Sequence, residues 1–261
     1  MCRHLAYLGP PVSPSDAVLR APHSLLVQSY APLDMRGGGT VNVDGFGVGW
    51  FAGDGYPTRY RRADPIWTDG ALPRLLEPVR TGSFLAAVRS GTPGMPVTET
   101  ACAPFADDDW LFSHNGVVLG WPESMARLAA EIPVVDLLHL DAPTDSALLW
   151  RALRFDLRRG RDPVAAVADL SFRVEAGAPG SRLNLLLAGR DLLVATAWSH
   201  SLSVRTAGGG VLVASEPCDG DPAWQAVADG DLVVARRTRG ADENVEPTVE
   251  ISTVEKERSQ A

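Results

Sequence analysis

Cys2 is the residue whose position most directly suggests chemistry. It follows Met1, and an initiator methionine is usually removed when the next side chain is as small as cysteine. Removal would give Cys2 a free α-amine, with a pKa of roughly 7.7–8.0, beside an intrinsically nucleophilic thiol. One residue would then hold both a nucleophile and a general base. The alternative is an ordinary cysteine near the end of a chain.

The stretch His114-Asn115-Gly116 could stabilise the charge that such a nucleophile creates. A thiol that attacks an amide builds negative charge on the carbonyl oxygen, and preorganised donors at that position are usually the largest catalytic contribution. Asn115 offers a side-chain amide and Gly116 an unobstructed backbone N–H, directly after the apolar run Trp110–Ser113. Asn-Gly is also the commonest signal of a tight hairpin turn, and this stretch alone favours the turn.

Arg89 and Asp145 are the candidates for binding an amino-acid-like substrate. An α-carboxylate is held best by a guanidinium, which can bind it through two parallel hydrogen bonds. Arg89 ends the apolar stretch Phe84–Val88 and precedes Ser90-Gly91-Thr92. An α-ammonium needs a carboxylate, and Asp145 lies at the start of a predicted helix. The alternatives are a surface arginine at a strand end and a carboxylate that caps the helix.

The chain offers no pattern for a metal, a cofactor or a different nucleophile. Its five histidines lack metal-ligand spacing, and its three cysteines are too scattered for a disulfide framework or a cysteine-rich zinc site. No Gly-x-Ser-x-Gly motif occurs. The only lysine is Lys256, which excludes a phosphate-binding loop of the Gly-Lys-Ser/Thr type. We therefore expect no metal and no cofactor.

Composition narrows the class of partner. Apolar residues make up 45% and charged residues 21% of the 261 residues, which is typical of a globular protein with a substantial core. The net charge of −8 argues against nonspecific nucleic-acid binding. No apolar run approaches the ~18 residues of a membrane span, and the N-terminus lacks an apolar secretory segment. We expect a cytoplasmic protein that binds a small molecule, with no nucleic-acid or membrane partner and with a homo-oligomer left open.

The first half of the chain predicts strands with short helices between them. Strands are predicted over residues 3–8, 44–51, 59–62, 84–89 and 110–113, with 24–30 as a further candidate. Segment 44–51 alternates glycine with larger apolar residues, which favours a strand whose small face lies beneath another element. Short helices are predicted over 71–80 and 122–132.

The second half predicts two helices and then an antiparallel sheet. The apolar spacing from Leu148 to Leu157 predicts an amphipathic helix over 145–159, and a second helix starts at Pro163 and runs to about Leu170. Short connections separate strands predicted over 183–188, 192–198, 202–206, 211–215 and 232–235. This order predicts an α+β layered fold. We expect one domain over 1–239, followed by a charged, flexible tail over 240–261.

The order of the candidate residues resembles the class II glutamine amidotransferase domain of the N-terminal-nucleophile hydrolases. That order is an N-terminal cysteine, Arg89 with Thr92, Asn115-Gly116, and then Asp145 before a helix. Longer stretches resemble the ergothioneine-biosynthesis amidohydrolases of the EgtC type, from residue 1 to about 236. These stretches are Met1–Ala6, Val27–Pro32, Val88–Ser90, Ser113–Gly116 and Ala214–Pro217. Two positions depart from the wider family: Gly91 replaces a more usual alanine, and Arg36-Gly37 is the remnant of a His-Arg-Gly motif.

The resemblance implies a four-layer αββα sandwich of antiparallel sheets. It also implies a hydrolase that cleaves the γ-glutamyl amide of γ-glutamyl-hercynylcysteine sulfoxide through a Cys2 thioester. Asn115 and Gly116 would form the oxyanion hole. Arg89 would hold the glutamyl carboxylate and Asp145 the glutamyl ammonium. Thr92 and His114 would belong to the same substrate pocket.

Two other functions remain open for these residues. A free-standing glutaminase that passes ammonia to a partner synthase would share the glutamyl-binding residues, and it ranks second because the chain contains no synthase domain. A noncatalytic module that binds glutamate-like metabolites would not need a terminal thiol. The leaving group of the implied reaction carries a trimethylammonium, which favours an aromatic wall with negative charge nearby. The sequence does not single out any of the seven tryptophans for that wall.

Overall fold

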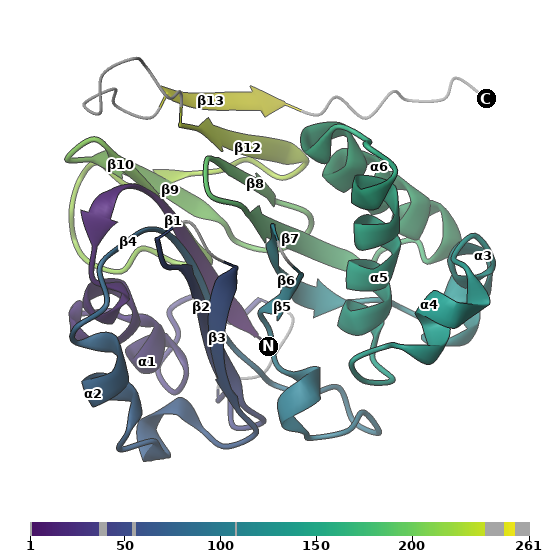
Figure 1. Cartoon of the computed structure of the whole chain (residues 1–261), viewed down its shortest axis with the longest axis horizontal. Coiled ribbons are helices and arrows are strands. Elements are labelled where there is room, and N and C mark those ends of the chain that lie inside the picture. The colour runs from purple at the N-terminus through teal and green to yellow at the C-terminus, as the bar shows by residue number, and fades with distance from the viewer. Residues whose placement is uncertain (1, 37–40, 54–55, 108, 238–247, 254–261) are drawn as a thin grey trace.

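Two β-sheets lie face to face between two layers of helices (Figure 1). The structure is a computed structural model that describes residues 2–36, 41–53, 56–107, 109–237 and 248–253, the last range by its backbone. The paired strands in both sheets run antiparallel. The predicted α+β fold and its four-layer αββα arrangement are therefore confirmed.

The first sheet carries Cys2 at the start of its central strand. Within the described part of the chain its strand order is β11 (Gln225–Ala226), β9 (Ser203–Ala207), β10 (Gly210–Ala214), β1 (Arg3–Val12), β4 (Thr81–Val88), β2 (Phe46–Phe51) and β3 (Pro57–Arg62). β1 thus has β10 on one side and β4 on the other. The register pairs Arg3 with Val88, so Cys2 starts where β4 ends.

The second sheet carries the Asn115 segment. Its described strands follow the order β13 (Thr248–Thr253), β12 (Asp231–Arg236), β8 (Leu192–Thr196), β7 (Arg182–Ala188), β6 (Leu111–Val117) and β5 (Phe105–Ala106). Asn115 pairs with Asn184 and Gly116 with Leu183 in the β6–β7 ladder. The turn that Asn115-Gly116 favours when taken alone is therefore wrong, because both residues are inside a strand.

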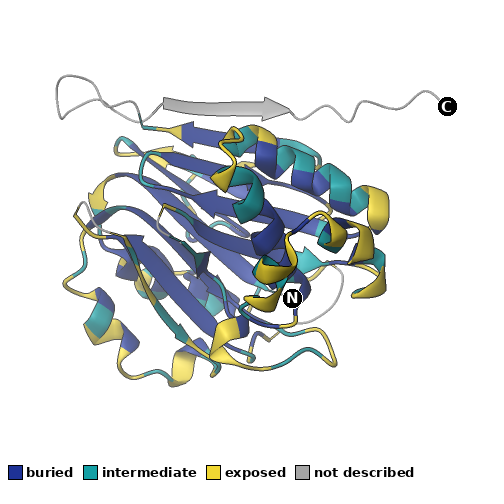
Figure 2. Ribbon diagram, turned by 45° about the vertical axis from the view of Figure 1, so that its right-hand side comes forward, coloured by how far each residue is buried: buried dark blue, intermediate teal, exposed yellow. Residues whose placement is uncertain are grey.

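Helices cover the outer face of each sheet. The outer face of the first sheet is covered by α1 (Leu25–Gln28) and α2 (Leu72–Leu76), with the short turns η1 (Asp16–Arg20) and η2 (Ile66–Thr68). The outer face of the second sheet is covered by α3 (Ala126–Ala130), α5 (Asp145–Arg158) and α6 (Pro163–Gly177), with α4 (Val134–Leu138) and η4 (Glu123–Met125) beside them; η3 (Glu99–Ala101) precedes β5. Figure 2 shows that most residues of the central strands are buried, whereas the helices carry exposed residues along their length; the edge strands β3 and β11 are largely exposed. No helix in the described ranges is long and apolar enough to span a membrane.

Most predicted elements occur, with differences that have physical causes. The candidate strand over 24–30 is wrong, because the Ser24 hydroxyl accepts the Val27 N–H and caps helix α1 instead. The glycine face of β2 lies beneath another element as predicted, since a Cβ at Gly47 would come within 2.3 Å of the Ala103 carbonyl oxygen. Helix α6 continues to Gly177, beyond the predicted end near Leu170.

The predicted tail contains one described strand. Thr248–Thr253 forms β13 and pairs with β12. Residues 240–247 and 254–261 lie outside the described residues, as do Gly37–Gly39 in the Arg36-Gly37 segment. The boundary at 239 and the flexibility of the tail stay predictions.

Strand alternation gathers polar side chains at one end of the space between the sheets. Successive side chains of a strand point to opposite faces. Ala6 of β1, Leu85 of β4 and Leu111 of β6 belong to the apolar core between the sheets. By the same parity Cys2, His4, Arg89 and Asn115 point into that layer at the ends of their strands. The sheets therefore bring four distant segments to a single site.

Trp150 tests the packing of the second helical layer. Its ring is 1% exposed and stacks on Phe112 with centroids 5.6 Å apart. We expect Trp150→Ala to lower the free energy of unfolding by about 3–5 kcal/mol, because it opens a cavity in a close-packed core. Leu138→Ala, at a side chain that is 78% exposed, should change it by less than about 0.5 kcal/mol. Urea unfolding followed by circular dichroism measures both, and equal losses would contradict the assigned packing.

Candidate active site

The Cys2 thiol lies against the backbone of Ser90. Its Sγ accepts a hydrogen bond from the Ser90 N–H at 3.4 Å and lies 3.6 Å from the Ser90 carbonyl oxygen. Cys2 and Arg89 line the same small cavity, together with Ser113, His114 and others. The structure therefore places the predicted nucleophile directly beside the predicted carboxylate clamp.

Arg89 is held by a residue that sequence reasoning missed. Asp44 accepts the Gly91 N–H on Oδ2 at 2.7 Å and donates its own N–H to the Arg89 carbonyl at 3.1 Å. Its carbonyl oxygen also accepts from Nη1 of Arg89 at 3.4 Å. Gly91 leaves room for the guanidinium, since a Cβ there would lie 3.2 Å from Nη2. Asp44 lies two residues before the glycine-rich strand β2, and only that strand pattern was visible in the sequence.

The Asn115 side chain reaches across to the first sheet. Its Nδ2 donates to Oγ of Ser215 at 3.0 Å. The Ser215 hydroxyl donates to the His4 carbonyl at 3.2 Å, so Oγ is the acceptor for the amide. Asn115 is fully buried, and its Oδ1 has no hydrogen-bond partner among the described residues. The amide orientation is thus fixed by Ser215 at the end of β10.

Gly116 has a packing reason to be glycine. A Cβ at this position would lie 1.8 Å from the Arg182 carbonyl oxygen on β7, so any side chain would displace the backbone. The neighbouring His114 also contacts that carbonyl, at 2.9 Å from Nε2, while its Nδ1 lies 3.0 Å from Oγ of Ser146. Both ring nitrogens of His114 are therefore engaged by protein groups.

Asp145 joins the end of β6 to the start of α5. Its Oδ2 accepts the Val118 N–H at 3.1 Å, and its Oδ1 accepts the Ser146 N–H at 2.6 Å. The helix cap itself is Thr144, whose hydroxyl accepts the Ala147 N–H. Asp145 is 5% exposed. Its neighbour Ser146 lines the Cys2 cavity, so the carboxylate lies at the edge of the site.

Thr92 is the predicted site residue that lies furthest out. It is exposed and lines a different cavity, of about 450 Å³, with Met95, Val118 and Trp121. Val118 is the residue whose N–H binds Asp145. Through Val118 this cavity therefore adjoins the Asp145 side of the site.

A buried ionic cluster fixes the start of β1. Nε of Arg3 lies 2.7 Å from Oε1 of Glu216, and both side chains are almost fully buried. Arg3 also donates to the Cys2 carbonyl at 3.0 Å and to the Asp34 carbonyl. The other oxygen of Glu216 contacts His23 at 2.7 Å. Burial alone would raise the pKa of Glu216, but the hydrogen bonds from His23 and the backbone, with the Arg3 charge, hold it below its ordinary value.

Two buried histidines lie behind the site. Nδ1 of His4 lies 3.1 Å from Oγ of Ser113, which links the two sheets. Burial, and then the nearby His200 and His114, lower the pKa of His4 to about 3. Burial and the nearby Arg3 charge lower the pKa of His200 to about 4. Both rings are therefore neutral at pH 7.

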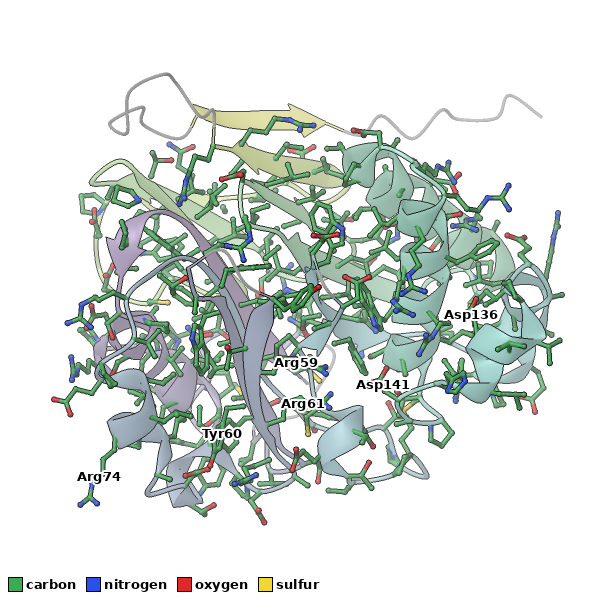
Figure 3. All side chains as sticks on the ribbon, viewed as in Figure 1. Arg59, Tyr60, Arg61, Arg74, Asp136 and Asp141 are labelled. Carbon is green, nitrogen blue, oxygen red and sulfur yellow. The ribbon has the colours of Figure 1, made fainter. Side chains whose placement is uncertain are left out.

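Two arginines of β3 hold the segment that covers the Cys2 cavity. Arg61 donates to the Cys102 carbonyl at 3.1 Å and Arg59 to the Pro104 carbonyl at 3.3 Å. Figure 3 shows both side chains extending from β3 on the side where Asp141 lies. Ala101, Ala103 and Phe105 of this segment line the cavity. No sequence motif marked this role.

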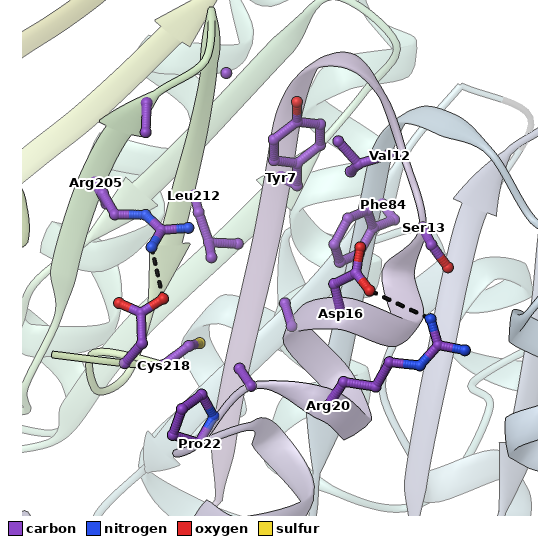
Figure 4. Close-up of a pocket in the computed structure, with 15 residues that line it drawn as sticks. Tyr7, Val12, Ser13, Asp16, Arg20, Pro22, Phe84, Arg205, Leu212 and Cys218 are labelled. Carbon is purple, nitrogen blue, oxygen red and sulfur yellow. Dashed lines mark hydrogen bonds and ion pairs between the residues drawn. The ribbon is translucent and has the colours of Figure 1, made fainter. Parts of the chain in front are cut away.

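A separate cavity of about 410 Å³ lies on the outer face of the first sheet (Figure 4). Tyr7, Phe84 and Leu212 contribute apolar walls, and ion pairs lie on two sides of it, Asp16–Arg20 at 3.5 Å and Arg205–Asp219 at 2.7 Å. None of the predicted site residues is among its described lining. Within the described residues no group of three or more histidine, cysteine or acidic side chains could hold a metal ion.

Comparison with known proteins assigns the family. The family model "Glutamine amidotransferases class-II" matches residues 21–208. The chain belongs to the class-II glutamine amidotransferase family. Within that family it is 40% identical over 238 residues to the γ-glutamyl-hercynylcysteine sulfoxide hydrolase of Mycolicibacterium smegmatis, covering 90% of this chain and 96% of that protein. It is 41% identical over 233 residues to the hydrolase of the same name from Mycobacterium tuberculosis, covering 89% of this chain and 92% of that protein.

Solved structures show that the fold is also that of the family. A glutamine aminotransferase class-II domain protein from Silicibacter pomeroyi superposes with a TM-score of 0.67 at 23% identity, over 97% of this chain and all of that one. The glutamine phosphoribosylpyrophosphate amidotransferase of B. subtilis gives a TM-score of 0.64 at 14% identity, over 97% of this chain and 50% of that one. This class-II glutamine amidotransferase chain therefore has the predicted N-terminal-nucleophile hydrolase fold.

The buried histidines predict a loss of stability in mild acid. In the unfolded chain His4 and His200 bind protons near pH 6.5. In the folded chain the pKa is about 3 for His4 and about 4 for His200. Unfolding therefore takes up protons, and the free energy of unfolding should fall as pH decreases from 6.5 toward 4. The slope is at most about 1.4 kcal/mol per pH unit for each histidine.

Urea unfolding between pH 7.5 and 5 measures this slope. His200→Gln should remove about half of it, and His139→Gln, at an exposed ring, should leave it unchanged. A slope that is the same in His200→Gln as in the unmodified protein would refute the assignment to His200.

Proposed function

We propose that this protein hydrolyses the γ-glutamyl amide of γ-glutamyl-hercynylcysteine sulfoxide in ergothioneine biosynthesis. The products would be glutamate and hercynylcysteine sulfoxide. The observation that carries the proposal is the Cys2 thiol beside Arg89 in one cavity, in a chain that is 40% identical to a hydrolase of that name over 96% of its length. A glutamyl group carries a carboxylate and an ammonium, which match the charges of Arg89 and Asp145.

The reaction begins at the Cys2 thiol after Met1 is removed. The freed α-amine takes the thiol proton, directly or through one water, and the sulfur attacks the γ-carbonyl carbon. The tetrahedral intermediate then expels the amine, which carries away the proton from the α-amine. Water hydrolyses the resulting γ-glutamyl thioester and releases glutamate with a free thiol. Splitting one difficult hydrolysis into two easier steps is the usual benefit of a covalent intermediate.

Asn115 and Gly116 are proposed to stabilise the oxyanion. A primary amide carries two N–H bonds, and Ser215 accepts only one of them. The second N–H is left for the developing charge, while the contact with Ser215 keeps the amide from rotating. A preorganised donor of this kind does not have to reorient during the reaction.

Arg89 and Asp145 are proposed to hold the two charges of the glutamyl group. The Asp44 contacts leave the fork of the Arg89 guanidinium able to bind a carboxylate. A carboxylate has about four acceptor positions, and Oδ2 of Asp145 accepts one N–H, so it can take an ammonium as well. Thr92 would support this side of the pocket. His114, with both nitrogens engaged, would form part of the wall that positions Ser146.

The second candidate is a glutaminase that passes ammonia to a synthase. It would use the same glutamyl-binding residues as the hydrolase, but its leaving group is ammonia, which is much smaller than hercynylcysteine sulfoxide. The similarity to the mycobacterial hydrolases covers nearly the whole chain, which favours the hydrolase.

Glutamate release tests the proposed function. Purified protein is incubated with γ-glutamyl-hercynylcysteine sulfoxide or with L-glutamine, and glutamate is quantified over time. We expect a clear preference for the sulfoxide, and Cys2→Ser should lose most activity because an alcohol is far less acidic than a thiol. Preference for glutamine would favour the glutaminase, and no release from either would favour a binding module. N-terminal mass analysis tests whether the Cys2 α-amine is the general base. Fully active protein that retains Met1 would show that it is not.

Asn115→Ala tests the oxyanion hole. We expect turnover to fall about 10²–10³-fold, because one donor to the developing charge is lost. Arg89→Ala should also raise KM, since it removes a contact made to bound substrate. Steady-state kinetics separate the two effects, and thermal unfolding serves as a check that the variants are folded. An Asn115→Ala enzyme with normal turnover would rule out this role.

A further inference from the structure

A second cavity adjoins the site on the side opposite to Arg89. Cys2 begins the central strand of the first sheet, with Arg89 at the end of β4 on one side and Ser215 at the end of β10 on the other. A cavity of about 440 Å³ lies on the Ser215 side. We propose that this cavity, which we call the Ser215 cavity, binds the leaving group as a zwitterion with a quaternary ammonium; this rests on the proposed function.

The Ser215 cavity shares its walls with the catalytic machinery. Ser215 lines it, and the same hydroxyl accepts the Asn115 amide. Asp34 lines it as well, and its carbonyl accepts from Arg3, which also donates to the Cys2 carbonyl. In this proposal the leaving group lies on the Ser215 side of the thiol, and the glutamyl group lies on the Arg89 side.

The charges around the Ser215 cavity suit a zwitterion. Asp34 and Asp229 present carboxylates, and Arg36 presents a guanidinium that is 59% exposed. Burial alone would raise the pKa of Asp34, but its hydrogen bonds from Arg36 hold it below the ordinary value, so the carboxylate is ionised. The Asp34–Arg36 pair lies at the surface, where ion pairs contribute little, so its members can exchange partners with a ligand. Leu33, Met35 and Leu202 supply apolar contact for methyl groups.

The cavity volumes also favour the Ser215 cavity as the binding site of the leaving group. The cavity that contains Cys2 and Arg89 measures about 30 Å³, which is far below the ~300–1,000 Å³ of typical ligand pockets. Substrate must therefore extend into adjoining space on both sides of the thiol. The cavity beside Thr92 adjoins the glutamyl side, which leaves the Ser215 cavity for the amine side. Cleavage of glutamine releases only ammonia and makes no use of this volume.

Filling the Ser215 cavity tests the proposal. Ala226 is exposed and lines the cavity, so Ala226→Trp fills it without disturbing the core. We expect the ratio of kcat/KM for the γ-glutamyl sulfoxide to kcat/KM for L-glutamine to fall at least tenfold. Ala228→Trp is the matched control, since Ala228 is also exposed but is not part of the described lining. Asp34→Asn, which keeps the acceptor for Arg36 and removes the charge, should lower the same ratio three- to tenfold through KM.

A variant in the cavity beside Thr92 tests the alternative that the leaving group binds there. Trp121→Ala changes that cavity and should leave the ratio within twofold. If Trp121→Ala lowers the ratio and Ala226→Trp does not, the leaving group binds beside Thr92 and the proposal is overturned.

A binding measurement separates this proposal from the proposed reaction. Histidine betaine, the zwitterionic part of the leaving group that carries the quaternary ammonium, is titrated into Cys2→Ala protein and followed by calorimetry. Ala226→Trp in that background should weaken binding at least fivefold, and Ala228→Trp should not. No binding of histidine betaine, or equal binding in both variants, overturns the assignment of the cavity. Failure of sulfoxide hydrolysis with selective binding intact would instead refute the proposed reaction alone.

Discussion

The buried contact between Arg3 and Glu216 fixes the position on which the site depends. Removing two charges from water costs several kcal/mol for each ion, and a buried pair is tolerated when further hydrogen bonds satisfy both groups. Here His23 and two backbone N–H groups also bind the Glu216 carboxylate. The carbonyls of Cys2 and Asp34 accept hydrogen bonds from the Arg3 guanidinium. The first residues of β1 are therefore held from both sides, although they lie at a chain end, where fraying is the default.

The layer between the sheets changes from apolar to polar along the strands. Alanine, leucine and valine fill it for most of its length, as Ala6, Leu85 and Val213 illustrate. At the Cys2 end the same strand faces carry His4, Ser113, Asn115 and Ser215, which bond to one another across the sheets. Buried polar groups are tolerated where partners satisfy them, and such networks restrict each group to one orientation. This layer thus orients the amide proposed to stabilise the oxyanion.

The substrate side of the proposal follows from the order of the strands. A nucleophile on a central strand has a neighbouring strand on each side, so the acyl group and the leaving group can be bound by different strands. Arg89 ends β4 on one side and Ser215 ends β10 on the other. This arrangement allows the leaving-group pocket to change while the glutamyl pocket is retained. A glutaminase and a hydrolase of larger amides can therefore share one fold and one set of glutamyl contacts.

The sequence by itself determined the layers, most strands and helices, and the residue types needed for γ-glutamyl chemistry. Periodicity and turn residues are local signals, which is why the amphipathic helix at Asp145 and the strands over 44–51 and 59–62 were predictable. Local signals failed at Ser24, where a side-chain cap gave a helix, and at Asn115-Gly116, where pairing with β7 replaced a turn. Only the tertiary structure decided that Asp44 supports Arg89, that Ser215 orients Asn115 and that Arg3 meets Glu216. Those contacts join residues 45 to 213 positions apart, and no local pattern encodes which distant partners the sheets bring together.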